Sequence, residues 1–274
     1  MILVSRIFYY LASIPTLFLG VKNRLTMLRV FAGQTRRAPT LIELRNGLRF
    51  QIRTPMDVWV LKEAVLERQY ERASVAIQDG WTIIDIGAGI GDFAIGVAHA
   101  HPRANVFAFE PFPESFALLQ ENLRLNSISN VKAFPLAIGN TSGTMQLTLA
   151  TPEPVQHRTV GTTTNTTTGI TVTSTTLDQV FAEHKLAACD YLKMDCEGAE
   201  YEIFFGMNPA TLKKIRHICL EHHNGVTQYS HVDLIRFFEQ NGFRAKRIPN
   251  PAHSDLGLVY AENKTPGFSE KPGS

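Results

Sequence analysis

The chain has 274 residues, of which 44% are hydrophobic and 19% are charged, and its formal net charge is +2. These values are ordinary for a globular protein, and so small a net charge gives no argument for nucleic-acid binding. The length suffices for one large domain and an N-terminal extension. The three cysteines (Cys189, Cys196 and Cys219) have no zinc-type spacing and lie in or next to apolar runs. We therefore expect reduced thiols and a cytoplasmic protein.

Residues 1–39 form an apolar and basic extension ahead of the domain. The apolar stretch ends near Val21, is broken by Arg6 and Pro15, and is followed by basic residues from Lys22 onward. It is marginal for a membrane span, which needs about 20 apolar residues, and its charges lie on the wrong side for a signal peptide. Three interpretations stay open: a helix packed on the domain, an in-plane membrane anchor, or a signal anchor. Peripheral membrane association through residues 1–31 is one expectation.

Residues 40–77 are expected to hold a hairpin and a helix that precede the core. Leu41 to Arg53 alternates apolar and polar residues around Asn46-Gly47, which is a strong hairpin signal. Helical periodicity follows from Asp57 to Ile77. Tyr70 lies near the end of that helix, where it either closes over a ligand or packs at the edge of the domain.

Residues 82–110 predict one βαβ unit. The apolar run Thr82–Ile86 reads as a buried strand, the glycine loop from Gly87 to Asp92 opens a helix, and a second strand, Val106–Phe109, ends in Glu110. Glycines let backbone amides approach a ligand, and a helix N-terminus favours an anionic or polar group. Glu110 can accept hydrogen bonds from both hydroxyls of a ribose. The unit therefore predicts a nucleoside site.

The glycine spacing distinguishes between cofactors. Dinucleotide sites have G-x-G-x-x-G, whereas here G-x-G-x-G is followed by Asp92 and preceded by Asp85. Carboxylates at these positions would repel a pyrophosphate but suit a ligand that carries an ammonium group. S-adenosylmethionine has an amino group, a carboxylate and a sulfonium. The candidate cofactor-binding residues are Tyr70, Asp85, Gly87, Ala88, Gly89, Asp92, Glu110, Pro111, Ala137 and Asp195.

Residues 78–262 are expected to form the main domain, with a threonine-rich insertion at 151–176 and a flexible tail at 263–274. Strands and helices alternate throughout, which predicts an α/β fold with a doubly wound, mostly parallel sheet. The further predicted strands are Asn130–Ile138, with Ala137 near the adenine, and then Thr144–Leu149, Cys189–Met194, His217–Leu220, Phe243–Ile248 and Leu256–Ala261.

Acids and histidines follow the predicted strands and should meet at one rim, because active sites in such sheets gather at the carboxyl ends of the strands. Methyl transfer to an alcohol needs alignment and a base that takes the proton. We expect Asp195, Glu221 and His222 to be catalytic, and Lys193, Glu197 and His223 to face the substrate side. A divalent metal bound by Asp195, Glu221 and His222 is an alternative way to lower the pKa of the alcohol.

Three motifs in this order resemble the FkbM-type S-adenosylmethionine-dependent methyltransferases: DxGAxxGDF from Asp85, ExxP from Glu110 and KxDxEGAE from Lys193. The resemblance spans roughly Leu41 to Glu221. It implies a Rossmann-like class I methyltransferase fold with a seven-stranded sheet, S-adenosylmethionine as donor, and oxygen as acceptor on a small molecule, such as a sugar or secondary metabolite, or on a glycan. It also implies cofactor binding by Asp85, Gly87, Gly89 and Glu110.

Two other interpretations compete with this one. A methyltransferase-like binding module without catalysis would have no need of Asp85, Glu110 and Asp195 together. An NAD-dependent oxidoreductase disagrees with the glycine spacing. Nucleic acid is not expected as a partner, since neither a basic stripe nor a base-methylating Asn-Pro-Pro-Tyr motif is present.

Overall fold

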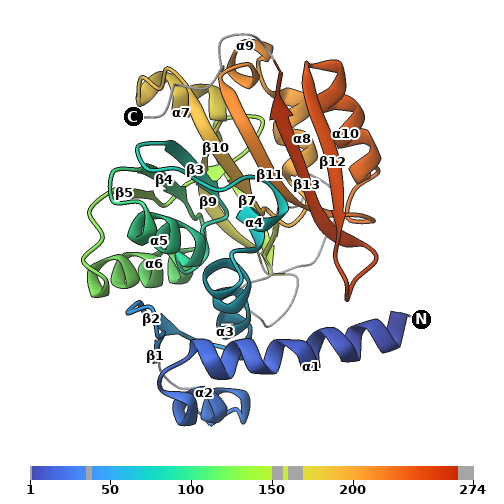
Figure 1. The fold of residues 1–274 in the computed structure, drawn as a ribbon. Helices are drawn as coiled ribbons and strands as arrows, with labels where there is room; N and C mark the ends of the chain where they lie inside the picture. Colours follow the sequence, from blue (N-terminus) through green and yellow to red (C-terminus); the bar gives the residue numbers. More distant parts are fainter. Residues whose placement is uncertain (1, 35–38, 150–156, 160–168, 265–274) are drawn as a thin grey trace.

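A seven-stranded sheet forms the centre of the computed structural model, which describes residues 2–34, 39–149, 157–159 and 169–264 (Figure 1). The strand order is β12-β13-β11-β10-β3-β4-β5. Six strands run in one direction, and β13, which pairs antiparallel with both β11 and β12, runs the other way. In chain order the strands are β3 (Thr82–Ile86), β4 (Asn105–Phe109), β5 (Val131–Phe134), β10 (Cys189–Met194), β11 (Ile215–His223), β12 (Phe243–Pro249) and β13 (Leu256–Asn263). The predicted doubly wound, mostly parallel sheet is confirmed.

Helices cover both faces of this sheet. They are α5 (Asp92–Ala100), α6 (Pro113–Leu125), α7 (Leu177–Glu183), α8 (Glu200–Gly206), α9 (Pro209–Leu212) and α10 (His231–Gln240). Because side chains alternate along a strand, neighbouring strand residues enter different cores. Ile84 packs with Phe204 and Phe238 of α8 and α10, whereas Ile83 packs with Phe93 of α5. The sheet is therefore buried on both faces, as its near-continuous apolar strands predict.

A second sheet has the order β6-β9-β7-β8. Its strands are β6 (Ala137–Ile138), β7 (Gly143–Leu149), β8 (His157–Thr159) and β9 (Gly169–Thr175). The prediction of one strand over Asn130–Ile138 was wrong, because β5 ends before Pro135 and β6 joins the second sheet. Proline has no N–H to donate to a ladder, which explains the break. Within the threonine-rich segment, β9 lies inside this sheet between β6 and β7, and the rest of 150–168 apart from β8 lies outside the described residues.

The N-terminal part packs around a third core. It comprises α1 (Ile2–Gly20), α2 (Arg24–Phe31), the hairpin β1 (Thr40–Glu43) and β2 (Arg49–Ile52), α3 (Pro55–Leu61), the π-helix η1 (Lys62–Leu66) and α4 (Gln69–Ala73). The hairpin is confirmed. The single helix expected over Asp57–Ile77 was wrong: a π-turn widens it, and Arg68 with φ +50° breaks it. Among the described residues, no helix combines the length and hydrophobicity needed to traverse a bilayer.

Candidate active site

A cleft opens at the carboxyl ends of the parallel strands, with about 1090 Å³ of empty space, part of it open to solvent. Gly87, Glu110, Asp195 and Glu221 line it, and each follows or ends a different strand. The acids expected at one rim therefore do lie together. The opposite wall comes from α3 and η1, which lie beside this end of the sheet (Figure 1).

The glycine loop brings backbone against the next strand end. Gly87 has φ +73°, and a Cβ there would lie 1.9 Å from the carbonyl oxygen of Asp195. Only glycine tolerates that approach. Gly91, with φ +89°, caps the N-terminus of α5 and points the first turn of that helix at the cleft. The loop thus offers backbone amides to a polar ligand group.

Glu110 is held by the backbone. The N–H of Gly89 donates to its Oε2 at 2.7 Å, and the N–H of Phe112 donates to its Oε1 at 2.9 Å. The side chain is nearly buried but lines the cleft, and burial raises the pKa of its carboxyl to about 7. Each carboxylate oxygen has a second lone pair, so both can still accept a hydroxyl. This geometry suits the two hydroxyls of a ribose.

A buried ion pair lies beneath the loop. Lys193 Nζ is 3.1 Å from Asp85 Oδ1 and donates to the carbonyl oxygen of Gly87 at 2.8 Å. Burial by itself would lower the pKa of the Lys193 ammonium, but the carboxylates of Asp85, Asp195 and Asp92 raise it above its usual value. Asp85 does not line the cleft. Lys193 itself lines the cleft, as expected for a residue on the substrate side, and with Asp85 it also supports the glycine loop from below.

Asp92 and Tyr70 flank the same end of the cleft. Asp92 begins α5, and burial raises the pKa of its carboxyl to about 7. The Tyr70 ring is buried, packs edge-on against Phe93 at 5.4 Å between ring centroids, and lies 5.5 Å from Lys193 Nζ. Both residues line the cleft, as expected. Tyr70 is therefore a fixed wall of the cavity in this structure.

An apolar end of the cleft lies beyond Glu110. Pro111 and Ala137 contribute to it, as expected, whereas the backbone of Ala88 lies outside the lining. Phe112 and Leu147 were not predicted, since Leu147 comes from the second sheet. Apolar walls next to a ribose-binding carboxylate suit the flat faces of an adenine.

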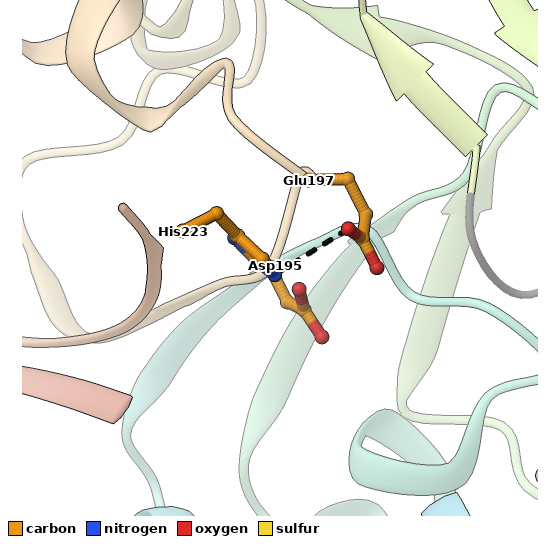
Figure 2. Close-up of side chains that lie close together, drawn as sticks. All are labelled: Asp195, Glu197 and His223. Carbon is orange, nitrogen blue, oxygen red and sulfur yellow. Dashed lines mark ion pairs between the residues drawn. The ribbon is translucent and has the colours of Figure 1, made fainter. Parts of the chain in front are cut away.

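The other end of the cleft carries a charge cluster, which Figure 2 shows as Asp195, Glu197 and His223. His223 Nε2 is 3.4 Å from Glu197 Oε2, and its Nδ1 is 3.4 Å from Glu200 Oε1. The buried Glu200 carboxylate is fixed by the N–H groups of Cys196 and Gly198, at 2.9 and 2.8 Å. Burial would lower the pKa of His223, but Glu200, Asp195 and Glu197 raise it to about 10. These carboxylates therefore favour the protonated form of His223.

His222 lies on the other side of β11. It is fully buried, accepts a hydrogen bond from Arg247 Nε at 3.1 Å, and its ring centroid is 4.7 Å from that of His231. Burial, His231 and Arg247 lower its pKa to about 3. The expectation that His222 faces the acceptor was wrong, because side chains alternate along a strand. Glu221 lines the cleft, and His223, not His222, shares its side.

The expected metal ligands are not brought together as a set. Among the described residues, the group whose ligand atoms all lie within 4.8 Å of one another is Asp195, Glu197 and His223. Glu221 faces the same space, and burial, together with the carboxylate of Asp195, raises its pKa well above the usual range. The acceptor end thus gathers four acidic side chains, Asp195, Glu197, Glu200 and Glu221, around His223.

Residues ahead of the glycine loop complete the cleft wall opposite the sheet, and the sequence analysis missed them. Arg53 lies 3.8 Å from Asp57 and donates to Ser115 Oγ at 3.0 Å. Asp57 also closes a capping box with Thr54 at the start of α3. Glu63 of η1 lines the cleft as well. The T-x-x-D capping pattern marked the helix start, but nothing local placed these side chains in the cleft.

A glycine loop next to the acid that follows β4, at the carboxyl ends of the parallel strands, is the arrangement of nucleoside-binding sites in Rossmann-like folds. Residues 85–245 match the methyltransferase FkbM domain family. The chain belongs to this family, and it is an S-adenosylmethionine-dependent methyltransferase.

Three relatives indicate the range of the family. Methyltransferase sdnD of Sordaria araneosa is 27% identical over 67% of this chain and 81% of its own length. The 31-O-demethyl-FK506 methyltransferase FkbM of Streptomyces tacrolimicus is 27% identical over 61% of this chain and 74% of its own length. The hexuronic acid methyltransferase AglP of Haloferax volcanii is 27% identical over 69% of this chain and 77% of its own length.

Proposed function

We propose that this protein is a cytoplasmic O-methyltransferase that transfers the methyl group of S-adenosylmethionine to a hydroxyl of a sugar, glycan or secondary metabolite. The observation that carries this proposal is the division of the cleft into a ribose-binding end at Glu110 and a carboxylate-rich end at Asp195 and Glu221. Relatives named for a 31-O-demethyl macrolide and for a hexuronic acid support an oxygen acceptor.

The cofactor roles follow from position. Glu110 accepts the ribose hydroxyls, Pro111 and Ala137 border the adenine, and the amides of the glycine loop meet the methionine part. Asp92 faces the positively charged amino group, and Asp195 faces the sulfonium, a charge that S-adenosylhomocysteine lacks. Asp85 and Lys193 hold the loop from below. The cofactor is thereby aligned before any acceptor enters.

The chemical step is a direct displacement. The acceptor oxygen forms a bond to the methyl carbon while the carbon–sulfur bond breaks, and its electron pair stays on sulfur, which becomes neutral. The hydroxyl proton goes to a carboxylate, for which Asp195 and Glu221 are the candidates. The raised pKa of Glu221 makes it a stronger base than an exposed glutamate once it is ionised. His223 and Glu197 border the acceptor.

A divalent cation is a second hypothesis for the acceptor end, favoured by the three ligand atoms of Asp195, Glu197 and His223. Such an ion would lower the pKa of the acceptor hydroxyl. Loss of turnover in EDTA, restored by Mg²⁺ or Mn²⁺, would support it. If EDTA leaves turnover unchanged, no metal ion lowers the pKa of the acceptor hydroxyl, and His223 is the positive charge that is left to do so.

The proposal is tested by incubating the protein with S-adenosylmethionine and a panel of hydroxylated sugars, uronic acids and macrolides. S-adenosylhomocysteine release and the mass gain of one methyl group are measured for each. Methylation at oxygen is expected, with the D195N variant as the inactive control. Methylation only at nitrogen or carbon would contradict the assignment of the acceptor.

A further inference from the structure

Exposed large apolar side chains gather in the first two helices. Among the residues whose side chains the structure describes, nine such side chains are exposed, and eight belong to α1 and α2. We call these eight the N-terminal apolar surface: Tyr10, Leu11, Ile14, Phe18, Leu19, Leu25, Leu28 and Phe31. Leu19 and Leu25 are 69% and 74% exposed. Single exposed apolar residues are ordinary, whereas a concentration of this kind marks an interaction site.

The two helices are fixed to the domain by their other side. Leu17, Val21, Met27 and Val30 are buried in the core that also holds the hairpin. On α1, Leu11, Ile14 and Phe18 follow the spacing i, i+3 and i+7, which is one stripe of a helix. Apart from Tyr10, whose half-exposed ring also packs against Trp59 at 5.1 Å between ring centroids, the N-terminal apolar surface is therefore the outer face of packed helices, not a core that has lost its partner.

Charge identifies the partner. Residues 1–42 contain no aspartate or glutamate, and their six basic residues are Arg6, Lys22, Arg24, Arg29, Arg36 and Arg37. Arg24 and Arg29 lie on α2, the helix that also presents Leu25 and Leu28. A second copy of the chain on this surface would bring like charges together, whereas anionic lipid headgroups complement them.

We propose that the N-terminal apolar surface docks on an anionic lipid bilayer and holds the protein there as a peripheral anchor. The apolar side chains enter the boundary between headgroups and acyl chains, and the arginines meet the lipid phosphates. Amphipathic helices with leucine and phenylalanine on one face and basic residues beside them bind membranes in this way.

Helix α1 contacts a residue that lines the cleft. Tyr9 Oη on α1 donates to Glu63 Oε1 at 2.5 Å, and Trp59 Nε1 donates to the same oxygen at 2.8 Å. Glu63 is part of the cleft lining. Figure 1 shows α1 running along the end of the molecule next to α3. Docking would thus hold the cleft beside the bilayer. That an acceptor carried on a lipid would reach it rests on the proposed function, whereas the docking itself does not.

Vesicle co-sedimentation of the full chain tests the docking. The probes are phosphatidylcholine vesicles with and without about 30 mol% phosphatidylglycerol. We expect at least about tenfold tighter binding to the anionic vesicles, weakened by salt because the arginine contacts are screened. No binding to the anionic vesicles, or binding that anionic lipid does not strengthen, would overturn the proposal.

Variants assign the binding to this surface. L19S/L25S should weaken vesicle binding at least about tenfold, and R24Q/R29Q should weaken it about fivefold for each arginine. The matched control is V232S. Val232 lies on α10 and is the one of the nine exposed apolar side chains that is outside α1 and α2, so this variant should bind vesicles like the wild type. All four leucine and arginine positions are outside the cleft, so affinity for S-adenosylhomocysteine should not change, whatever the acceptor proves to be.

One other outcome is decisive. If the wild type forms a dimer in sedimentation velocity that L19S/L25S dissociates, and vesicles do not compete with it, the surface is an interface between copies and the proposal is wrong. Near-wild-type thermal unfolding of the variants, expected because the side chains are exposed, ensures that lost binding is not lost folding.

Discussion

The two ends of the cleft are held together by different means. At the cofactor end, backbone groups fix the functional side chain: the N–H groups of Gly89 and Phe112 hold Glu110. At the acceptor end, backbone N–H groups fix only Glu200, and ion pairs between side chains then place His223 between Glu200 and Glu197. The first arrangement depends on loop conformation, and the second depends on a balance of charge.

The two ends are both readable in the sequence. A backbone-held site needs glycines at fixed positions, so the motif that begins at Asp85 is easily recognised. The acids of the charge cluster, Asp195, Glu197 and Glu200, lie within the KxDxEGAE motif. One relative is named for 31-O-demethyl-FK506 and another for a hexuronic acid, so these motifs do not by themselves identify an acceptor.

The largest expected effect concerns the acceptor end. D195N should lower turnover by at least about a hundredfold, because it removes a carboxylate that faces the sulfonium and the acceptor hydroxyl. The measurement is the rate of S-adenosylhomocysteine release with any acceptor that the panel identifies. Activity within a few-fold of the wild type would remove Asp195 from the chemistry.

The ion pair beneath the loop should matter for stability. K193M leaves Asp85 buried without its partner, so the free energy of unfolding should fall by about 3–5 kcal/mol. The double variant D85N/K193M should recover part of this loss. Chemical denaturation measures all three proteins, and a K193M protein as stable as the wild type would show that Asp85 is neutral or hydrated.

Loss of Glu110 should act on binding. E110A should weaken S-adenosylhomocysteine binding about ten- to a hundredfold, because two ribose hydroxyls lose a charged acceptor. D79A, which removes an exposed carboxylate paired with Arg103, is the matched control and should bind normally. Equal affinity of E110A and the control would take the ribose role away from Glu110.

The raised pKa of Glu110 predicts a pH dependence. The group ionises only as the pH rises through about 7, so S-adenosylhomocysteine affinity should rise about three- to tenfold between about pH 6 and 8. The stability of the ligand-free protein should change in the opposite direction and fall as the pH rises. The raised pKa of Glu110 contributes stability that is fully present below pH 4.5, the usual pKa of a glutamate, and that is lost as the pH passes about 7. E110Q should remove the part of the pH dependence of affinity and of stability that comes from Glu110. Any pH dependence that E110Q retains would be assigned to Asp92.

The smallest effect on turnover is expected at His222. H222Q should leave turnover within about twofold of the wild type, whereas H223Q should lower it more, since only His223 joins the charge cluster at the cleft. The ratio of the two rates is the informative number. A larger loss in H222Q at unchanged stability would return His222 to the site.

Sequence alone predicted the elements whose pattern is local. The glycine loop, the strands Thr82–Ile86 and Cys189–Met194, and the hairpin around Asn46-Gly47 follow from periodicity and turn chemistry, and the structure has them. The sequence did not predict which side chains of distant segments pair. Lys193 and Asp85 are register partners on adjacent strands, which is why their charges meet beneath the loop.

Two wrong predictions, the placement of His222 in the cleft and the strand through Ile138, could have been avoided from the sequence. Alternation from Glu221 selects His223, not His222, for the cleft. Pro135 cannot continue a ladder, so a strand through Ile138 was excluded in advance. The wall at Arg53, Asp57 and Glu63 had no such signal, because only the packing of α3 and η1 against the sheet end brings it there.

The measurement that tests the division of the cleft most directly is a calorimetric titration of S-adenosylhomocysteine into the wild type, E110A and D195N, with NAD as the control ligand. The wild type and D195N should bind alike at micromolar concentration, E110A should bind at least about tenfold more weakly, and NAD should not bind. A D195N protein that loses as much affinity as E110A would show that the two ends act as one site and would contradict the account.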